Sequence, residues 1–353
     1  MKHLWLCGLG LLLATVASCG QGPTVKRVIF ITNSDSPFWA AARAGIEEAN
    51  RDLKLGEVGL NAVMIVNNGT TAGQIEKLRQ FASQSDVAAV AISVNDANNQ
   101  AIVDELKALQ AKGIPVITVD SDVNREKYRD VRRVFLGTDN FVAGRELGTA
   151  MKHLLPEGGK YVTFVGITGA QNAIDRVGGI EAGAGPSFQR IDNMGDQTDL
   201  TVARENVRSA LRNHPDLSAL VGIWAYNAPA IADVVKENSD KARPKVVVFD
   251  AQADTIQHMR DGYIDVMIVQ DPYQMGYKAV QIMKALVLND EKVLAELYPK
   301  LGEENGDIHE TGLKIVVPDT NSPLKPDFFD ANTQFYTLDE FQKWLDKYKL
   351  TSS

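Results

Sequence analysis

Short apolar runs alternate with longer amphipathic segments from residue 26 to residue 269 of this chain. The runs are rich in Val and Ile, and the segments between them carry apolar side chains at helical spacing. The clearest runs lie at 28–31, 61–66, 87–92, 116–119, 134–136, 161–165, 219–223, 246–249 and 266–269. Such alternation is typical of βαβ units, whose right-handed crossovers build a parallel sheet covered by helices. The sequence therefore predicts an α/β fold, and its second half repeats the pattern of the first.

The segment 26–50 shows one such unit and places a candidate site on it. Residues 28–31 are β-branched or aromatic throughout, as in a strand buried on both faces. A polar loop, 33–37, separates this strand from a helix that begins near Phe38 and Trp39. These two aromatics then lie at the carboxyl end of the first strand, where open α/β sheets place their ligands. We expect them to stack on a sugar-like ligand, and ordinary core packing is the alternative.

Residues 1–18 have the features of an export signal. A lysine is followed by an apolar run and then by small residues before Cys19, and the run is too short to span a bilayer. The tetrad Val-Ala-Ser-Cys resembles the bacterial lipobox. That resemblance implies a lipid on Cys19, a tether over 19–25 and a location in the periplasm or cell envelope, with a plain secretory peptide as the alternative. Removal of Cys7 would leave no partner for a disulfide.

Charge and length narrow the class of protein further. The formal net charge is −8, and removal of the signal takes away one lysine and no acid, which makes it −9. An acidic chain without basic blocks argues against a nucleic-acid partner. The 353 residues are 44% hydrophobic and 23% charged, a composition that suits two folded domains and argues against disorder.

Polar residues follow three successive strands of the first half. They are Asn67-Asn68-Gly69, Ser93-Val94-Asn95-Asp96 and Asp120-Ser121-Asp122. Because parallel strands end at one edge of a sheet, these residues share that edge with Phe38 and Trp39. Local turn chemistry is the alternative for each group, since Asn, Asp and Ser are favoured in loops.

A series of motifs in order along residues 26–290 resembles the ribose-binding-protein type of periplasmic binding protein, the sugar-binding component of bacterial ABC importers. The motifs are Ser36–Trp39 with Gly45, Gly113–Asp120, Gly137–Asn140, Gly169–Ala173 with Asp175 and Arg176, Phe249-Asp250, and Val269–Pro272. The resemblance implies two doubly wound parallel-sheet lobes joined by a three-strand hinge. It assigns 26–137 plus about 271–290 to an N-terminal lobe and 138–270 to a C-terminal lobe. Residues 291–353 exceed the pattern and are expected to pack on a lobe near the hinge.

The same resemblance implies a set of ligand contacts. A buried polyol needs a partner for each hydroxyl, and charged partners serve well because a carboxylate accepts from two hydroxyls and a guanidinium donates in a planar fork. The expected ligand-binding residues are Phe38, Trp39, Ser93, Asp120, Arg176, Asn227, Asp250 and Gln270. Three positions depart from the ribose pattern: the segment 224–227, Ser121 and Thr198. The ligand class is therefore predicted as a sugar or sugar-like polyol, with its identity open.

These features predict an extracytoplasmic solute-binding lipoprotein that delivers its ligand to an ABC permease, acts as a monomer, and uses no cofactor or metal. The five histidines are scattered, and the sequence contains neither a phosphate loop nor a dinucleotide fingerprint. A sensor lipoprotein that presents a sugar or signalling molecule to a membrane receptor is the alternative. A glycoside-processing enzyme that uses Asp120 and Asp250 is a remote one.

Overall fold

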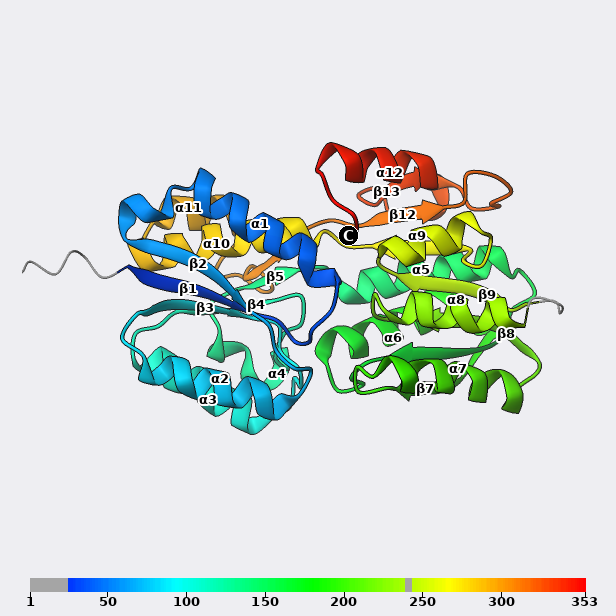
Figure 1. Cartoon of the computed structure of the whole chain (residues 1–353), viewed down its shortest axis with the longest axis horizontal. Coiled ribbons are helices and arrows are strands. Elements are labelled where there is room, and N and C mark those ends of the chain that lie inside the picture. Colours follow the sequence, from blue (N-terminus) through cyan, green and yellow to red (C-terminus); the bar gives the residue numbers. More distant parts are fainter. Residues whose placement is uncertain (1–24, 239–242) are drawn as a thin grey trace, which may run out of the picture.

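The computed structural model describes residues 25–238 and 243–353, which form two lobes lying side by side (Figure 1). The expected signal peptide, Cys19 and all of the expected tether except its last residue lie outside the described residues. Each lobe is an α/β unit with helices on both faces of a central sheet, as predicted.

The first lobe contains a six-stranded sheet in the order β11-β5-β4-β3-β1-β2. All of its neighbouring strands pair in parallel. The strands are β1 Lys26–Ile31, β2 Leu60–Ile65, β3 Val87–Ile92, β4 Val116–Val119, β5 Phe135–Gly137 and β11 Ile308–Glu310. The helices are α1 Phe38–Asp52, α2 Thr71–Ser83, α3 Gln100–Ala111, α4 Arg125–Tyr128, α10 Pro272–Leu288 and α11 Glu291–Leu297. Helices α1, α10 and α11 cover one face, and α2 and α3 cover the other (Figure 1).

The second lobe contains a seven-stranded sheet in the order β13-β12-β10-β9-β8-β6-β7. Its strands are β6 Gly159–Val165, β7 Phe188–Gly195, β8 Leu217–Gly222, β9 Lys245–Phe249, β10 Val266–Val269, β12 Lys314–Val317 and β13 Gln334–Thr337. Its helices are α5 Asn140–Leu154, α6 Gln171–Ala184, α7 Leu200–Asn213, α8 Asn227–Glu237, α9 Ala253–Arg260 and α12 Leu338–Lys347. Helices α5 and α6 bury one face of the sheet, and α8, α9 and α12 help to bury the other.

Three connections join the lobes, and the third explains two differences from the predicted architecture. The chain crosses between β5 and α5, between β10 and α10, and between β11 and β12. Because β12 enters the second lobe from the hinge whereas β10 leaves toward it, these two strands pair antiparallel and the sheet is not purely parallel. Residues 291–353 do not pack on one lobe: α11 and β11 complete the first, whereas β12, β13 and α12 belong to the second.

Glycines allow α5 and α6 to pack backbone against backbone in the second lobe. A Cβ atom at Gly144 would lie 2.1 Å from the carbonyl oxygen of Arg176, and one at Gly179 would lie 2.1 Å from that of Phe141. Side chains at these positions would push the helices apart. This close packing fixes the position of α6, the helix that carries Arg176.

We expect Gly179→Ala to lower the free energy of unfolding by about 1–3 kcal/mol, because the added methyl overlaps backbone that cannot move alone. Gly178→Ala is the matched control on the same helix, since its Cβ would lie 3.8 Å from Phe141 Cε2, an ordinary van der Waals contact. That control should stabilise the protein by about 0.4–1 kcal/mol, as alanine is favoured over glycine in helices. Urea unfolding of both variants measures the difference. Equal stabilities would contradict the packing argument.

Candidate ligand-binding site

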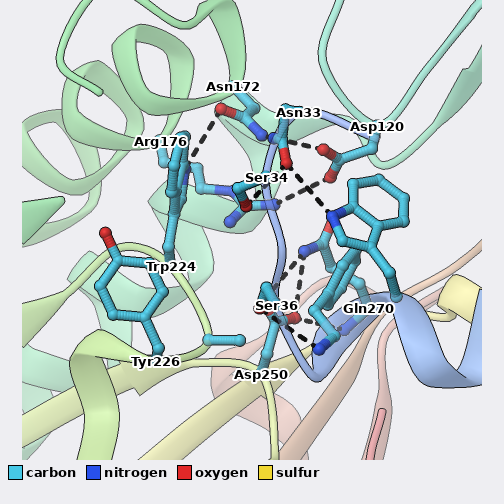
Figure 2. Close-up of a pocket in the computed structure, with 13 residues that line it drawn as sticks. Asn33, Ser34, Ser36, Asp120, Asn172, Arg176, Trp224, Tyr226, Asp250 and Gln270 are labelled. Atoms are coloured by element: carbon cyan, nitrogen blue, oxygen red, sulfur yellow. Dashed lines mark hydrogen bonds and ion pairs between the residues drawn. The ribbon is translucent and has the colours of Figure 1, made fainter. Parts of the chain in front are cut away.

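A pocket lies between the two lobes, at the carboxyl ends of their parallel strands (Figure 2). Its lining residues come from both lobes and from one crossover: Asn33, Ser34, Ser36, Phe38, Trp39, Asp120, Asn172, Arg176, Trp224, Ala225, Tyr226, Asp250 and Gln270. Six of the eight ligand contacts expected from the sequence are among them. This is the location that open α/β sheets provide for a ligand.

Asp120 and Asp250 occupy equivalent places in the two lobes. Asp120 follows β4 and Asp250 follows β9, and both have a φ of 63°. The backbone N–H of each still donates to the neighbouring strand, Asp120 to Leu136 O at 3.0 Å and Asp250 to Ile268 O at 2.7 Å. The left-handed conformation is sparsely populated by residues other than glycine and is maintained where the surroundings enforce it, often at functional sites. The two carboxylates are thus placed by the same local geometry in each lobe.

Arg176 is fully buried and lies near enough to both carboxylates to feel their charges. Its Nε donates to Asn140 Oδ1 at 2.9 Å and its Nη1 donates to Ile223 O at 2.8 Å. The guanidinium lies 4.3 Å from the centre of the Phe249 ring, a cation–π contact. Its Nη2 is 3.9 Å from Asp120 Oδ1 and has no hydrogen-bond partner among the described residues. One donor of the fork therefore stays available to a ligand.

Burial dominates the electrostatics of the site. It raises the pKa of Asp120 and raises that of Asp250 to about 6, and the charge of Arg176 opposes both shifts. Gln270 Nε2 donates to both oxygens of Asp250, at 3.0 and 3.2 Å, whereas Gln270 Oε1 is buried without a partner in the described part of the chain. An unpaired donor and an unpaired acceptor thus belong to two residues that line one cavity, and a hydroxyl group can satisfy either. The arrangement suits a polyhydroxylated ligand.

Aromatic side chains line both sides of the cavity. In the first lobe Phe38 and Trp39 meet edge to face, with ring centres 4.9 Å apart, and Trp39 Nε1 donates to Asn33 Oδ1 at 3.2 Å. In the second lobe Trp224 Nε1 donates to Asn172 Oδ1 at 3.3 Å. Because both indole N–H groups are satisfied within the protein, these rings contribute apolar surface to the cavity. Sugars have C–H faces that pack on such surfaces.

Gly166 makes room for the ring of Trp224. A Cβ at residue 166 would lie 2.3 Å from Trp224 Cζ3 and 2.6 Å from the hydroxyl oxygen of Tyr226. These two aromatics belong to the segment that departs from the ribose pattern, and both line the cavity.

Two predicted contacts do not line the cavity. Ser93 lies behind Asp120 and donates its Oγ to Asp120 Oδ2 at 2.9 Å. Asn227 begins α8, where its Oδ1 accepts from Trp224 N at 3.0 Å and its Nδ2 donates to Asp196 Oδ2 at 2.9 Å. Both side chains therefore support the lining residues, because their polar atoms are already hydrogen-bonded within the protein.

Seven lining residues are outside the predicted set of eight contacts: Asn33, Ser34, Ser36, Asn172, Trp224, Ala225 and Tyr226. The first three belong to the polar loop before Phe38, Asn172 lies within the motif 169–173, and the last three belong to the segment 224–227. The sequence analysis singled out all three stretches without predicting these side chains as contacts. Asn172 Nδ2 donates to Asp120 Oδ2 at 3.2 Å across the cleft, and Ala97 N donates to Gly169 O at 3.4 Å. These contacts between the lobes describe a closed cleft.

The other polar residues at strand ends serve the loops themselves. Asn67 donates to Asn33 O and to Thr70 O, both at 3.0 Å. Asp122 accepts two hydrogen bonds from the buried guanidinium of Arg132, at 2.9 and 2.7 Å. Neither residue lines the cavity, and both are held by hydrogen bonds within the first lobe.

Ligand affinity should fall at acidic pH. Sugar hydroxyls that donate to Asp250 favour its ionised form, so protonation competes with binding below a pKa of about 6. Because the pKa of Asp250 in the folded protein is raised, the pH range over which affinity falls lies near pH 6 rather than near 4. Isothermal titration at pH 7.5 and 5.0 should show a dissociation constant about tenfold weaker at the lower pH, with protons released on binding near pH 6. An affinity that is constant over this range would contradict an ionised Asp250 in the complex.

Neither a metal site nor a membrane span is present in residues 25–238 and 243–353. No group of three or more His, Cys, Asp or Glu side chains there could hold a metal ion. None of the helices in those ranges combines the length and apolarity needed to cross a membrane.

Comparison with known proteins identifies the family. Residues 27–291 match the periplasmic binding protein domain. The chain is 25% identical over 302 residues to the ribose import binding protein of Salmonella typhimurium, covering 85% of this chain and 96% of that protein. It is 23% identical to the xylose/arabinose-binding protein of Sulfolobus acidocaldarius, and the match covers 87% of this chain and 73% of that protein.

A solved structure has the same fold. It is an ABC transporter solute-binding protein from Burkholderia graminis in complex with D-arabinose, 26% identical, with a TM-score of 0.72 and coverage of 85% of this chain and 97% of that one. The family match spans three quarters of the chain, and the relatives agree with it along most of their length. The chain therefore belongs to the type I periplasmic binding protein family, as its sequence motifs predicted.

Proposed function

We propose that this protein captures a monosaccharide or a similar polyol between its lobes, outside the cytoplasm, and delivers it to an ABC importer. The observation that carries the proposal is a pair of buried polar atoms on two lining residues, Arg176 Nη2 and Gln270 Oε1, which have no hydrogen-bond partner among the described residues. Leaving such atoms unpaired costs about 1–3 kcal/mol each. A ligand whose hydroxyls both donate and accept removes that cost, whereas an apolar ligand would retain it.

The charged lining also favours a neutral, hydroxylated ligand. Asp120 and Asp250 flank a single cation, Arg176, in a buried site. An anionic ligand would meet two carboxylates, and a cationic ligand would meet the guanidinium. Hydroxyl groups can donate to the former and accept from the latter without adding a charge.

Ligand binding would stabilise the closed arrangement of the lobes. Trp39 and Asp120 belong to the first lobe, Trp224 and Asp250 to the second, and Gln270 to the crossover between them. A ligand that contacts both sides at once binds the closed form better than an open one, and differential affinity of this kind shifts a hinge equilibrium. A closed complex is the form that an importer could distinguish from the empty protein.

Export and anchoring belong to the same proposal. The apolar run before Cys19 and its lipobox-like tetrad support secretion and attachment through a lipid on that cysteine. The importer partner is supported by the relatives, which include a ribose import binding protein and a solute-binding protein of an ABC transporter. A binding rather than an enzymatic role is supported by the use of Asp120 and Asp250 as acceptors within the site.

A ligand screen tests the proposal directly. Pentoses, hexoses and polyols should be compared by thermal unfolding at millimolar concentration. A true ligand at about 100 times its dissociation constant should add about 2.7 kcal/mol to the free energy of unfolding. The ligand should be recovered unchanged, because a binding protein does not hydrolyse it. A screen in which no sugar or polyol raises the unfolding temperature would reject the proposed ligand class.

A further inference from the structure

The segment 350–353 lies directly behind two lining residues of the cavity. Ser353 is buried, its N–H donates to Ala251 O at 3.0 Å, and Ala251 N–H donates to Ser353 O at 2.8 Å. The hydroxyl of Ser353 donates to Gln270 O at 2.8 Å. One serine thus joins the residue that follows Asp250 to Gln270, and the chain end marked C in Figure 1 lies between the lobes.

Helix α12 holds this segment in place. The helix begins with a capping box between Thr337 and Glu340, and it buries Phe341 and Leu345 against the second lobe. Leu350 packs into the same cluster, and its N–H donates to Leu345 O at 2.9 Å. The segment therefore leaves a fixed helix and follows a defined path to the rear of the cavity.

A second contact holds the other side of Gln270. Lys314 of β12 is buried, and its Nζ lies 3.2 Å from Asp271 Oδ2 and 4.1 Å from the centre of the Trp344 ring of α12. Asp271 Oδ1 in turn accepts from Gln274 N at 3.0 Å and caps α10. Gln270 is therefore bound at its own carbonyl by Ser353, and its neighbour in sequence is bound by Lys314.

We propose that Ser353 is a positioning residue of the ligand site, which holds Asp250 and Gln270 in the geometry that binds ligand. The matched family region ends at residue 291, so this contact is additional to it. Both residues need such support. Asp250 has a left-handed backbone, and Gln270, a lining residue, donates its amide nitrogen to Asp250 while its amide oxygen is buried without a partner in the described part of the chain. A shift of Gln270 would disturb the carboxylate and the free acceptor together.

Three variants and two measurements test the role of Ser353. Of the two measurements, only that of ligand affinity depends on the proposed sugar-binding function. The variants are Ser353→Ala, the adjacent Ser352→Ala as a matched control, and a chain lacking residues 351–353. Ser352 is also buried, and in the described part of the chain its hydroxyl has no hydrogen bond to Ala251 or Gln270. The first measurement is calorimetric titration with D-arabinose, D-ribose and D-xylose. The second is an NMR titration of the Asp250 carboxyl in the ligand-free protein.

We expect Ser353→Ala to weaken pentose binding about fivefold, which corresponds to the loss of one hydrogen bond. Removal of residues 351–353 should weaken pentose binding by more than about tenfold. Ser352→Ala should match the wild type. In the ligand-free protein, the pKa of Asp250 should rise in the truncated chain, because the hydrogen bond from Gln270 lowers it in the intact one. The melting temperatures of the two serine variants should differ by no more than a few degrees, the effect of one hydrogen bond, which separates positioning from general stability.

Unchanged Asp250 titration in the truncated chain would overturn the assignment, whatever sugar binds. Equal affinities of Ser353→Ala and wild type would overturn it as well. If none of the three pentoses binds the wild type, that result counts against a pentose as ligand, and the Asp250 titration still decides the role of Ser353.

Discussion

Replacing Asp250 with Asn is expected to abolish stabilisation by the ligand and to leave the ligand-free protein at least as stable as before. The gain of about 2.7 kcal/mol at saturating ligand should vanish, because the variant offers a neutral amide where the ligand needs a charged acceptor. Asn suits this position, since it tolerates the left-handed backbone that Asp250 adopts. The backbone of the loop is therefore preserved, and a loss of binding reports on the side chain.

The sign of the change in ligand-free stability follows from the raised pKa. Burial raises the pKa of Asp250 to about 6, so the folded protein binds this proton more tightly than the unfolded chain does. Above pH 6 the ionised carboxylate lowers the free energy of unfolding by its full amount. This penalty shrinks as pH falls from 6 toward about 4, the pKa of the same carboxyl in the unfolded chain. Asn carries no such penalty at pH 7.5. Thermal unfolding with and without ligand measures both effects.

Asp265→Asn is the matched control for this experiment. Asp265 is also buried in the second lobe, but it precedes β10 at the far end from the cavity, where it pairs with Arg243 and Lys245. Asp265→Asn should lower the free energy of unfolding of the ligand-free protein and leave the stabilisation by ligand unchanged. If Asp250→Asn retains the full ligand shift, the proposed site is wrong.

Replacing Arg176 with Met is expected to remove both ligand binding and a large part of the folding stability. Asp120 and Asp250 would then share a buried site without their cation, and breaking a buried ion pair in this way costs about 3–5 kcal/mol. The loss of the guanidinium would also leave Asn140 Oδ1 and Ile223 O without the donors that they have in the native protein. Binding should weaken by more than about a hundredfold, because the cavity loses its one cationic donor.

The pH dependence distinguishes this mechanism from simple loss of packing. In Arg176→Met the two carboxylates should take up protons more readily, so the stability deficit relative to wild type should shrink as pH falls from 7.5 to 5. Lost packing alone would give a deficit that does not change with pH. Chemical unfolding at several pH values provides the measurement.

Arg204→Met is the corresponding control on the surface of the same lobe. Arg204 pairs with Asp233 at 3.0 Å, and both side chains are more than one third exposed. Its substitution should cost at most about 1 kcal/mol and should not affect the ligand. If the two arginine variants lose similar amounts of folding stability, burial of the Arg176 charge is not the cause of the loss in Arg176→Met.

Local patterns in the sequence predicted the α/β character of both halves of the chain, whereas the interleaving of the two lobes came from the family resemblance. Alternating apolar runs and amphipathic segments predicted the α/β lobes, because strand and helix each impose their own spacing on buried side chains. The position of a residue at the carboxyl end of a strand also predicted the edge on which Phe38, Trp39, Asp120 and Asp250 line the cavity. Both inferences need only the chain direction and the period of each element.

Tertiary structure decided what each polar side chain does. Ser93 and Asn227 resembled ligand contacts in sequence, but their partners, Asp120 and Asp196, occupy their polar atoms. Residues 291–353 carried no sign that they divide between the lobes or that Ser353 reaches Gln270. A hydrogen bond depends on which groups distant segments bring within about 3 Å, and the sequence fixes that distance only through the complete fold.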